Sequence, residues 1–389
     1  MQQSNVAIIG AGIGGLAAAL ALLRAGQRVQ IFELVDTLGE VGAGLSITPN
    51  AGKALRALGL ASDLEKVGNR PPAGAIRHFA TGEQLVALPQ DQSELRYGIP
   101  LFHVHRADLH SALLSAILEL DPHCLRTGAG LTDLQTSGHG VQFSLTDGSE
   151  HAADWLVGAD GIHSRTRQQI FGADQPNFTG YVAWRGLIPG DQVPPALLDP
   201  PLCMTVGPRR MLMRYPLRRG SWVNFVAVAK RAAWVEEGWS VPSTLDELLT
   251  EFADFEEHTL ALLRLTPVDR LFKWGLFDRD PLVTWIQGRV TLLGDAAHAM
   301  PPFTGQGAVM ALEDAVVLGR AAALANDPQE ALSRYEQARL SRVTHALQMS
   351  RSRADLYFAD EPSTQVQALA AGMAELRTLY DYDAGQVAI

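Results

Sequence analysis

Hydrophobic positions along the chain recur with two periods, and the switches between them outline the expected elements. A continuous apolar run at residues 6–9 is typical of a buried strand, and the Ala- and Leu-rich stretch that continues to Arg24 is typical of a helix. A second short apolar run, residues 29–32, ends at Glu33. The order strand, helix, strand predicts a βαβ unit at the start of the chain.

The central part of the chain is richer in short β-like runs. Alternating strands with polar turns, typical of an antiparallel insertion, are expected over residues 74–98, and the Thr146-Asp147-Gly148 turn predicts a hairpin over residues 141–154. A helix is expected at residues 244–256. Four further strands, separated by Pro and Gly turns, are predicted at residues 181–188, 202–206, 211–215 and 222–229.

Helical periodicity dominates the remaining segments. Helices are predicted at residues 50–58 and 106–119, and again at 306–324 and 328–351 after a buried strand at 289–293. Because these α/β segments enclose the β-rich ones, the simplest topology is a discontinuous domain with an insertion. The expected division is an α/β domain of residues 1–73, 98–175 and 269–350, an inserted β-sheet lobe of residues 74–97 and 176–268, and a helical segment of residues 351–389.

A G-x-G-x-x-G sequence lies between the first strand and the first helix. Its glycines permit a tight turn, close approach of the backbone to a pyrophosphate and close helix–strand contact, and the helix N-terminus favours an anion. Glu33, at the end of the second strand, can accept both hydroxyls of an adenosine ribose. A purely structural glycine turn is the weaker interpretation in this context. We therefore expect a bound dinucleotide at Gly10, Gly12, Gly15 and Glu33.

Two later motifs favour FAD over NAD. The segment Gly158-Ala159-Asp160-Gly161 follows a buried strand, and basic residues then open a helix. Asp295 ends another strand, where an aspartate can hold a ribityl hydroxyl. The segment Gly305-Gln306-Gly307 offers backbone N–H groups to the electron-rich edge of an isoalloxazine. Each motif alone is common, but their ordered combination is specific.

In this order the motifs resemble those of the class A FAD-dependent aromatic hydroxylases. Segments 41–50 and 379–384 are similar to the salicylate hydroxylase branch, with hydroxybenzoate and hydroxynicotinate hydroxylases nearby. The resemblance covers nearly the whole chain and is weakest over residues 190–285. It implies an α/β (α+β) fold: a discontinuous Rossmann-like FAD-binding domain, an inserted β-sheet substrate domain and C-terminal helices.

The resemblance also implies cofactors and a reaction. Only one nucleotide fingerprint is present, so NADH or NADPH is expected to bind transiently. The implied reaction is hydroxylation of a small phenolic acid or N-heteroaromatic ring by O2, through a flavin C4a-hydroperoxide in a site that excludes water. The positions that match FAD contacts are Gly14, Glu33, Gly44, Arg106, Leu131 and Asp295, with Asp160 in a motif that serves both FAD and the nicotinamide donor.

The strand at residues 211–215 is expected to line the substrate site opposite Pro302 and Phe303. Alternation places Arg210 and Arg214 on one face, so these residues and the Met and Tyr side chains cannot all point inward. We favour the face that carries Met211, Met213 and Tyr215.

The candidate catalytic residues are Tyr215, as a hydrogen-bonding group to the phenol, with Pro302 and Phe303. The alternative for Tyr215 is a core or rim position. The candidate substrate-binding residues are Arg210, Met211 and Met213. Some relatives carry a His near the positions of Arg210 and Phe303, which this chain lacks, so the catalytic base is left open. His298 is expected to pack and form hydrogen bonds rather than act as a base.

Composition narrows the partners. Acidic residues number 42 against 32 Lys and Arg, a balance that disfavours electrostatic binding to nucleic acid or anionic membranes. Two distant cysteines and the absence of metal-ligand spacing predict neither a disulfide framework nor a metal site. The cysteine usage and the lack of a secretory signal suit the cytoplasm.

The apolar stretch 6–23 could be taken for a transmembrane helix, but its glycines favour a strand, a turn and a helix. A homodimer is the usual oligomeric state in the family that the chain resembles.

Three alternative functions are weighed against the aromatic hydroxylase. The first is a monooxygenase of the same fold that acts on a non-aromatic ring, by epoxidation or hydroxylation. The second is a flavin-dependent halogenase, which is disfavoured because Gly186 stands where that family's Trp-x-Trp-x-Ile-Pro motif has its second Trp. The third is a flavin-binding redox sensor without turnover. It is disfavoured because the segment 302–307, which is expected to contact the flavin, is intact.

Overall fold

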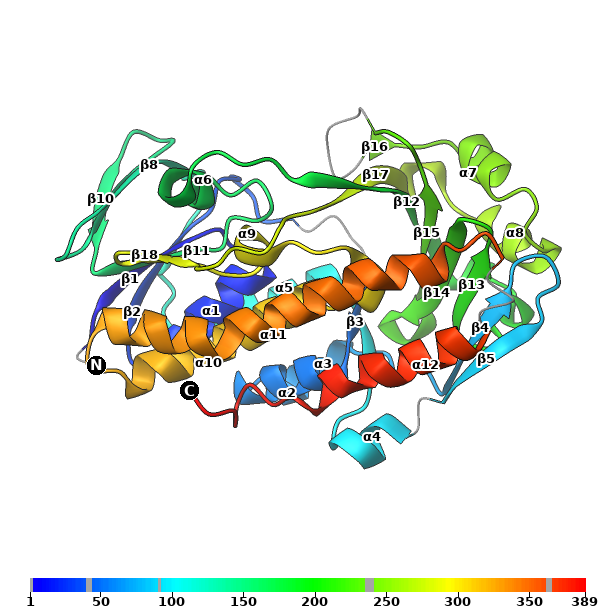
Figure 1. Ribbon diagram of the computed structural model, residues 1–389, viewed down its shortest axis with the longest axis horizontal. Coiled ribbons are helices and arrows are strands. Elements are labelled where there is room, and N and C mark those ends of the chain that lie inside the picture. The colour runs from blue at the N-terminus through cyan, green and yellow to red at the C-terminus, as the bar shows by residue number, and fades with distance from the viewer. Residues whose placement is uncertain (1–2, 40–43, 90–91, 235–240, 362–365) are drawn as a thin grey trace.

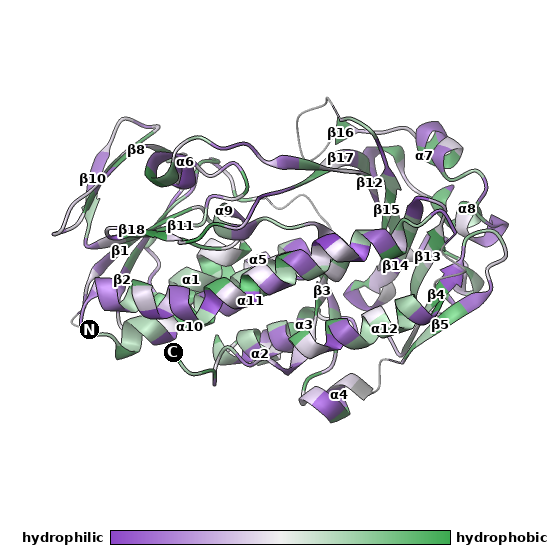
Figure 2. Ribbon diagram, viewed as in Figure 1, coloured by the Kyte–Doolittle hydropathy of each residue, from purple (hydrophilic) through white to green (hydrophobic). Residues whose placement is uncertain are grey.

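The fold is described by a computed structural model covering residues 3–39, 44–89, 92–234, 241–361 and 366–389. Two sheets lie toward opposite ends of an elongated molecule, and the long helix α11 (Pro328–Tyr357) runs between them (Figure 1). Hydrophilic and hydrophobic residues alternate along this helix (Figure 2). One side of α11 is therefore buried, including Leu332, Tyr335, Val343 and Leu347.

The first sheet has six strands in the order β18-β19-β11-β1-β2-β7. Its pairings are parallel except for the short edge strand β18. The predicted βαβ unit is confirmed: β1 and β2 are adjacent and are joined by α1 (Ile13–Arg24). The strands are β1 (Asn5–Ile9), β2 (Arg28–Phe32), β7 (Leu125–Arg126), β11 (Trp155–Gly158), β18 (Ile286–Gln287) and β19 (Val290–Leu292).

Two small antiparallel sheets accompany the large ones, one in contact with β1 of the first sheet and the other with the second large sheet, described below. The predicted hairpin is confirmed as β9 (Val141–Leu145) and β10 (Glu150–Ala153), with β8 (Leu131–Thr136) beside β9. The other small sheet pairs β3 (Gly44–Ile47) with β6 (Phe102–His105).

The second large sheet has eight strands in the order β16-β17-β12-β15-β14-β13-β4-β5. It joins the β-rich segments that the sequence separates, because β4 pairs with β13. The boundary expected at residue 268 divides this sheet, since β17 pairs with β12 and extends the sheet to Asp278. Its strands are β4 (Ala73–His78), β5 (Gln84–Pro89), β12 (Asn177–Pro189), β13 (Leu202–Gly207), β14 (Arg210–Leu217), β15 (Trp222–Lys230), β16 (Val241–Pro242) and β17 (Leu271–Asp278).

The helix expected at residues 244–256 is wrong in its extent, because the helix there ends at Glu251 and the next helix begins only at Glu257. Thr244 caps α7 (Leu245–Glu251), after which Phe252 and Phe255 enter the core. The carboxylate of Glu256 then accepts hydrogen bonds from the N–H groups that open α8 (Glu257–Leu263). Two buried aromatic side chains and a new N-cap therefore interrupt the helical pattern.

The remaining helices lie around the two large sheets. No helix in the described ranges is long and apolar enough to cross a membrane, and the stretch at residues 6–23 forms β1 and α1. These helices are α2 (Pro49–Ala57), α3 (Ala61–Val67), α4 (Gln92–Tyr97), α5 (Arg106–Leu120), α6 (Arg165–Phe171), α9 (Asp295–His298), α10 (Gly307–Leu324) and α12 (Val366–Leu376).

Candidate active site

The glycine loop before α1 packs closely against the loop that follows β11. Gly10 has φ +101°, and a Cβ atom there would lie 2.5 Å from the carbonyl oxygen of Ala159. A Cβ atom at Gly15 would lie 2.0 Å from the carbonyl oxygen of Gly10, so neither position has room for a side chain. At Gly12 no atom lies within 4 Å of the corresponding position. The open side at Gly12, at the N-terminus of α1, suits a pyrophosphate.

Glu33 lies beside this loop, directly after β2. Its carboxylate accepts hydrogen bonds from the N–H groups of Ala11, at 2.6 Å, and Val35, at 3.1 Å. The N–H of Ala129 donates to the carbonyl oxygen of Glu33 at 2.7 Å, which places the segment leading to Leu131 next to Glu33. Two predicted cofactor positions distant in sequence therefore lie on adjacent segments.

The carboxylate of Asp160 is hydrogen-bonded by donors of the chain itself. Its carboxylate accepts hydrogen bonds from the Ser164 hydroxyl, at 2.6 Å, and from the backbone and side chain of Thr166, at 2.9 and 3.1 Å. Burial raises the pKa of Asp160, and these hydrogen bonds oppose the shift. Asp160 thus fixes the start of α6 and the loop that packs against Gly10. Its contact with FAD or the nicotinamide donor stays a prediction.

Asp295 differs from Asp160 in its exposure. It is the first residue of α9, shortly after β19, and its side chain is exposed. None of the residues in the described segments donates a hydrogen bond to its carboxylate. This carboxylate is therefore available to a ligand hydroxyl, and its contact with a ribityl hydroxyl stays a prediction.

The segment of residues 302–307, called here the flavin loop because the sequence predicts that it binds the isoalloxazine, turns the side chain of Gln306 inward. Gly305 has φ +65° and ends a short 3-10 turn, and the buried amide of Gln306 then donates to Thr48 Oγ1 at 3.3 Å. The same amide accepts a hydrogen bond from Asn50 Nδ2 at 3.1 Å. The inward side chain leaves the backbone N–H groups at the start of α10 for an electron-rich partner.

Phe303 points from the flavin loop into an apolar cluster on the eight-stranded sheet. Its ring lies 5.1 Å from both Tyr181 and Phe358, and Met211 belongs to the same cluster. Pro302, at the start of the 3-10 turn, is exposed. The structure thus brings Phe303 and Met211 together, while Pro302 lies outside their cluster.

The predicted alternation of β14 is confirmed. Met211 packs on the flavin-loop side of the sheet, and Leu212 packs in the separate core beneath α7 and α8. Met213 contacts both the Phe303 cluster and a smaller cluster that contains Tyr215. The face with Met211, Met213 and Tyr215, called here the Met/Tyr face, is the one that faces the flavin loop.

Tyr215 is buried against both strands of the small sheet, β3 and β6. Its ring stacks on His103 at 4.0 Å, and a Cβ atom at Gly44 would lie 2.5 Å from it. His103 Nδ1 lies 3.2 Å from the Ser46 hydroxyl, and Asn224 accepts a hydrogen bond from the N–H of Gly44 at 2.9 Å. Burial raises the pKa of Tyr215 and lowers the pKa of His103 to about 3. Both rings are therefore neutral near pH 7.

The assignment of Arg210 to the substrate site is corrected. Its guanidinium donates to the carbonyl oxygen of Glu251 and pairs with Asp254 at 2.6 Å. It also lies over the ring of Phe255, 5.6 Å from the centroid, within the opposite core. Strand alternation places Arg210 on the face away from the flavin loop.

Arg185, which the sequence analysis missed, lies on the Met/Tyr face. It stands opposite Val226 in the sheet, and Val226 stands opposite Met213. Its guanidinium lies 4.5 Å from the Trp274 ring centroid, and its charge acts on the pKa of Tyr215. The signal was present in the Trp184-Arg185-Gly186 run, but only the strand register connects it with β14.

Arg106 begins α5, directly after β6. His105 caps this helix by accepting a hydrogen bond from the N–H of Ala107 at 3.3 Å. This cap fixes the backbone at the start of α5, where Arg106 lies. His298 forms the expected hydrogen bond, to Asp314 at 2.6 Å. No group of His, Cys, Asp or Glu side chains suited to a metal ion occurs among the residues that the structure describes.

Comparison with known proteins agrees with this geometry. Residues 3–350 match the family model described as an FAD binding domain. A 3-amino-4-hydroxybenzoate 2-monooxygenase from Streptomyces platensis is 36% identical and aligns over 99% of this chain and 98% of its own length. The crystal structure of Klebsiella pneumoniae HpxO with FAD and uric acid has a TM-score of 0.87 at 29% identity, covering 97% of this chain and 96% of that one. A salicylate hydroxylase substrate complex has a TM-score of 0.84 at 28% identity, covering 98% of this chain and 96% of that one.

Proposed function

The chain belongs to the family of FAD-dependent class A aromatic hydroxylases, and from this premise we propose that it hydroxylates a small anionic aromatic ring, with NADH or NADPH as electron donor and O2 as oxygen donor. It is an FAD-dependent aromatic monooxygenase. When bound, FAD accepts a hydride and activates O2 for transfer of one oxygen atom to the ring. The chain's own residues hold the cofactor, orient the ring and exclude water.

Three features of the chain fit FAD. The space beside Gly12 suits the pyrophosphate, the Asp295 carboxylate suits a ribityl hydroxyl, and the inward-turned Gln306 leaves N–H groups for the isoalloxazine. Glu33 would hold the adenosine ribose. The residues proposed to hold FAD are Gly10, Gly12, Gly14, Gly15, Glu33, Gly44, Arg106, Leu131, Asp160, Asp295, Gly305, Gln306 and Gly307.

The proposal of an anionic ring is carried by Arg185, a guanidinium on the apolar Met/Tyr face. Met213 and Val226 share its row across the sheet, and Phe303 closes the cluster from the flavin loop. An apolar surface accommodates an aromatic ring, and a guanidinium binds a carboxylate through two parallel hydrogen bonds. The benzoate-type substrates named for the Streptomyces relative and for salicylate hydroxylase have this chemistry.

Tyr215 and Phe303 are proposed to orient the ring and to keep the site dry. Because burial raises its pKa, the Tyr215 hydroxyl stays protonated and donates a hydrogen bond to the substrate's hydroxyl oxygen. Phe303 packs with Tyr181 and Phe358 into an aromatic wall that excludes water. Pro302 is proposed to set the start of the turn that presents Phe303.

The test is a substrate screen on protein loaded with FAD. Hydroxybenzoates, hydroxypyridine carboxylates and urate are offered with NADH or NADPH, and we measure NAD(P)H oxidation, peroxide and the mass of the product formed under isotopically labelled O2. We expect a carboxylated phenol to stimulate NAD(P)H oxidation and to gain one labelled oxygen atom. Stimulation only by uncharged or non-aromatic rings would contradict the proposal, and stimulation by urate alone would exclude the carboxylate at Arg185.

A further inference from the structure

The C-terminal motif at residues 379–384 takes no part in the site described above. It follows α12 and lies against α2, α10 and α11 (Figure 1). Arg342 of α11 donates to the carbonyl oxygen of Leu379 at 3.0 Å. Lys53 of α2 donates to the carbonyl oxygens of Tyr380 and Asp381 at 3.0 and 3.1 Å. The chain end is therefore fixed to three helices that also contribute to the protein interior.

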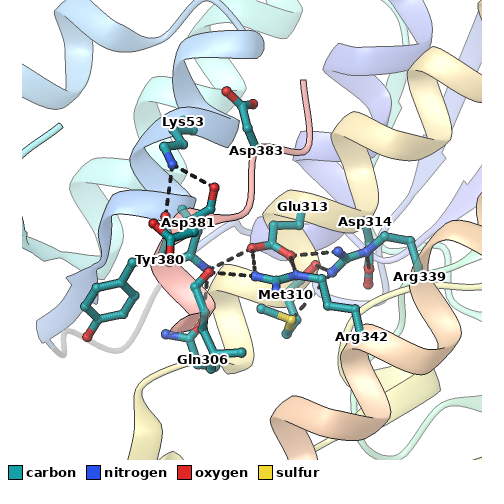
Figure 3. Close-up of polar contacts among 12 residues, drawn as sticks. Lys53, Gln306, Met310, Glu313, Asp314, Arg339, Arg342, Tyr380, Asp381 and Asp383 are labelled. Carbon is teal, nitrogen blue, oxygen red and sulfur yellow. Dashed lines mark hydrogen bonds and ion pairs between the residues drawn. The ribbon is translucent and has the colours of Figure 1, made fainter. Parts of the chain in front are cut away.

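Beneath this motif, α10 carries two adjacent carboxylates that are fully buried. Glu313 accepts hydrogen bonds from Arg339, at 2.7 Å, and from Arg342, at 2.7 and 2.8 Å (Figure 3). Asp314 accepts hydrogen bonds from Arg339 at 2.7 Å and His298 at 2.6 Å. Burial by itself would raise the pKa of Asp314, but the Arg339 charge and the hydrogen bonds from His298 and Arg339 hold that pKa below its usual value. A carboxylate in such surroundings is tolerated only while its partners stay in place.

Each carboxylate is also connected with a different one of the predicted flavin motifs, Asp314 directly and Glu313 through Asn50. Asn50 Nδ2 donates to Glu313 at 2.7 Å and to the side chain of Gln306 at 3.1 Å, so two hydrogen bonds connect Glu313 with the flavin loop. The N–H of Gly294, the residue before Asp295, donates to Asp314 at 3.3 Å. The two carboxylates thus hold both segments that carry the predicted isoalloxazine and ribityl contacts.

Tyr382 covers the guanidinium groups that neutralise these carboxylates. Its ring centroid lies 3.8 Å from the Arg342 guanidinium and 5.3 Å from that of Arg339. The hydroxyl of Tyr382 is buried and has no hydrogen-bond partner among the residues described. The ring face, rather than the hydroxyl, is therefore the part of Tyr382 that interacts with the network.

We propose that the C-terminal segment 379–383 positions the flavin, with Tyr382 as its central residue. The ring keeps water from Arg339 and Arg342, these hold Glu313 and Asp314, and the carboxylates hold Gln306 through Asn50 and Gly294 directly. Tyr382 is a positioning residue, because it acts on the cofactor through others. The inference rests on the proposed contact between FAD and residues 305–307.

The experiment compares Tyr382→Leu with Tyr382→Phe. Apoprotein is titrated with FAD to obtain the dissociation constant, and the thermal midpoint is measured with and without FAD. Tyr382→Leu removes the ring face and is expected to weaken FAD binding by about fivefold to tenfold, reducing the rise in midpoint that FAD produces. Tyr382→Phe keeps the ring face and is expected to stay within about twofold of the parent protein.

Arg334→Met is the matched control. Arg334 also lies on α11 and donates to the chain end, at Ile389, but it has no contact with Glu313 or Asp314. The Arg334→Met protein is expected to bind FAD with the same affinity as the parent protein. If Tyr382→Leu does not fold, Arg342→Lys is used instead, which keeps the charge but loses the planar guanidinium. Arg342→Lys should also weaken FAD binding.

Three outcomes would overturn this inference while FAD binding by the parent protein stands. Tyr382→Leu could lower both thermal midpoints equally without changing FAD affinity, which would show a structural role only. Tyr382→Phe could lose as much affinity as Tyr382→Leu. Arg334→Met could reproduce the loss, which would assign it to loosening of the whole chain end. Failure of the parent protein to bind FAD would instead contradict the proposed function.

Discussion

Tyr215 stacks face to face on His103, with ring centroids 4.0 Å apart and planes inclined by 17°. The stack joins β14 of the eight-stranded sheet to β6 of the small sheet, and it lies next to Gly44. Because both rings are buried and neutral, they form a rigid and uncharged boundary between the substrate sheet and the nucleotide-binding part of the chain.

Tyr215→Phe should keep this stack and remove only the hydroxyl. We expect kcat/KM for the preferred phenolic acid to fall by about tenfold to hundredfold, because a buried hydrogen bond to the substrate is lost. Since neither ring ionises in this range, the loss should stay constant from about pH 6 to about pH 9. Steady-state kinetics across pH check this. A loss that changes steeply with pH would show that Tyr215 titrates.

His103 should make the protein sensitive to acid. Its pKa falls from 6.5 to about 3 on burial, so between these values the unfolded chain binds a proton that the folded protein excludes. The free energy of unfolding should therefore decrease as pH falls through this window, by about 1.4 kcal/mol per pH unit at most from this residue.

His103→Gln removes this titration. Urea unfolding at pH 7 and pH 5 should show a smaller pH dependence for His103→Gln than for the parent protein, by about 2 kcal/mol over this interval. Equal pH dependence in both proteins would mean that His103 is protonated in the folded state.

Arg185→Met should weaken the binding of a carboxylated substrate. We expect KM to rise by about tenfold to hundredfold through loss of a charge-assisted hydrogen-bonded pair, with a much smaller change for the corresponding uncharged phenol. Arg210→Met is the control, because Arg210 lies on the opposite face of the same sheet. Equal effects of the two changes would exclude Arg185 as the carboxylate partner.

Gly12→Ala and Gly15→Ala should separate cofactor binding from folding. A methyl group at Gly15 meets the Gly10 carbonyl at 2.0 Å, so Gly15→Ala should lower the thermal midpoint of the apoprotein. A methyl group at Gly12 meets no protein atom within 4 Å, so Gly12→Ala should leave the apoprotein stable and weaken FAD binding by about tenfold or more. Thermal midpoints with and without FAD measure both effects. Normal FAD affinity in Gly12→Ala would place the pyrophosphate elsewhere.

The pattern of neighbouring residues was sufficient to predict most elements of the fold and to identify the cofactor motifs. The βαβ unit, the hairpin at Thr146-Asp147-Gly148 and six strands of the eight-stranded sheet lie where apolar periodicity and turn residues predict them, whereas β16 and β17 were not predicted. A further exception is the segment 244–256, where buried Phe252 and Phe255 end one helix before the next begins. These predictions succeed because periodicity and turn chemistry act over a few residues.

The candidate substrate face shows the limit of local pattern. Alternation along β14 separates Arg210 from Met211, but it does not decide which set faces the flavin loop. That choice depends on α7 and α8, which cover the Arg210 face, and on Phe303, which packs on the other. Arg185 reaches the same face from β12 through β15, by a register of cross-strand pairs that a single strand does not encode.

The sequence by itself therefore determined the family, the cofactor and the order of elements, because each motif is a short run whose chemistry depends on its nearest neighbours. Tertiary structure alone decided which guanidinium faces the ring and how Tyr382, Arg342, Glu313 and Gln306 are connected. Those relations join residues far apart in the chain, and they arise only when sheets and helices pack and water is excluded between them.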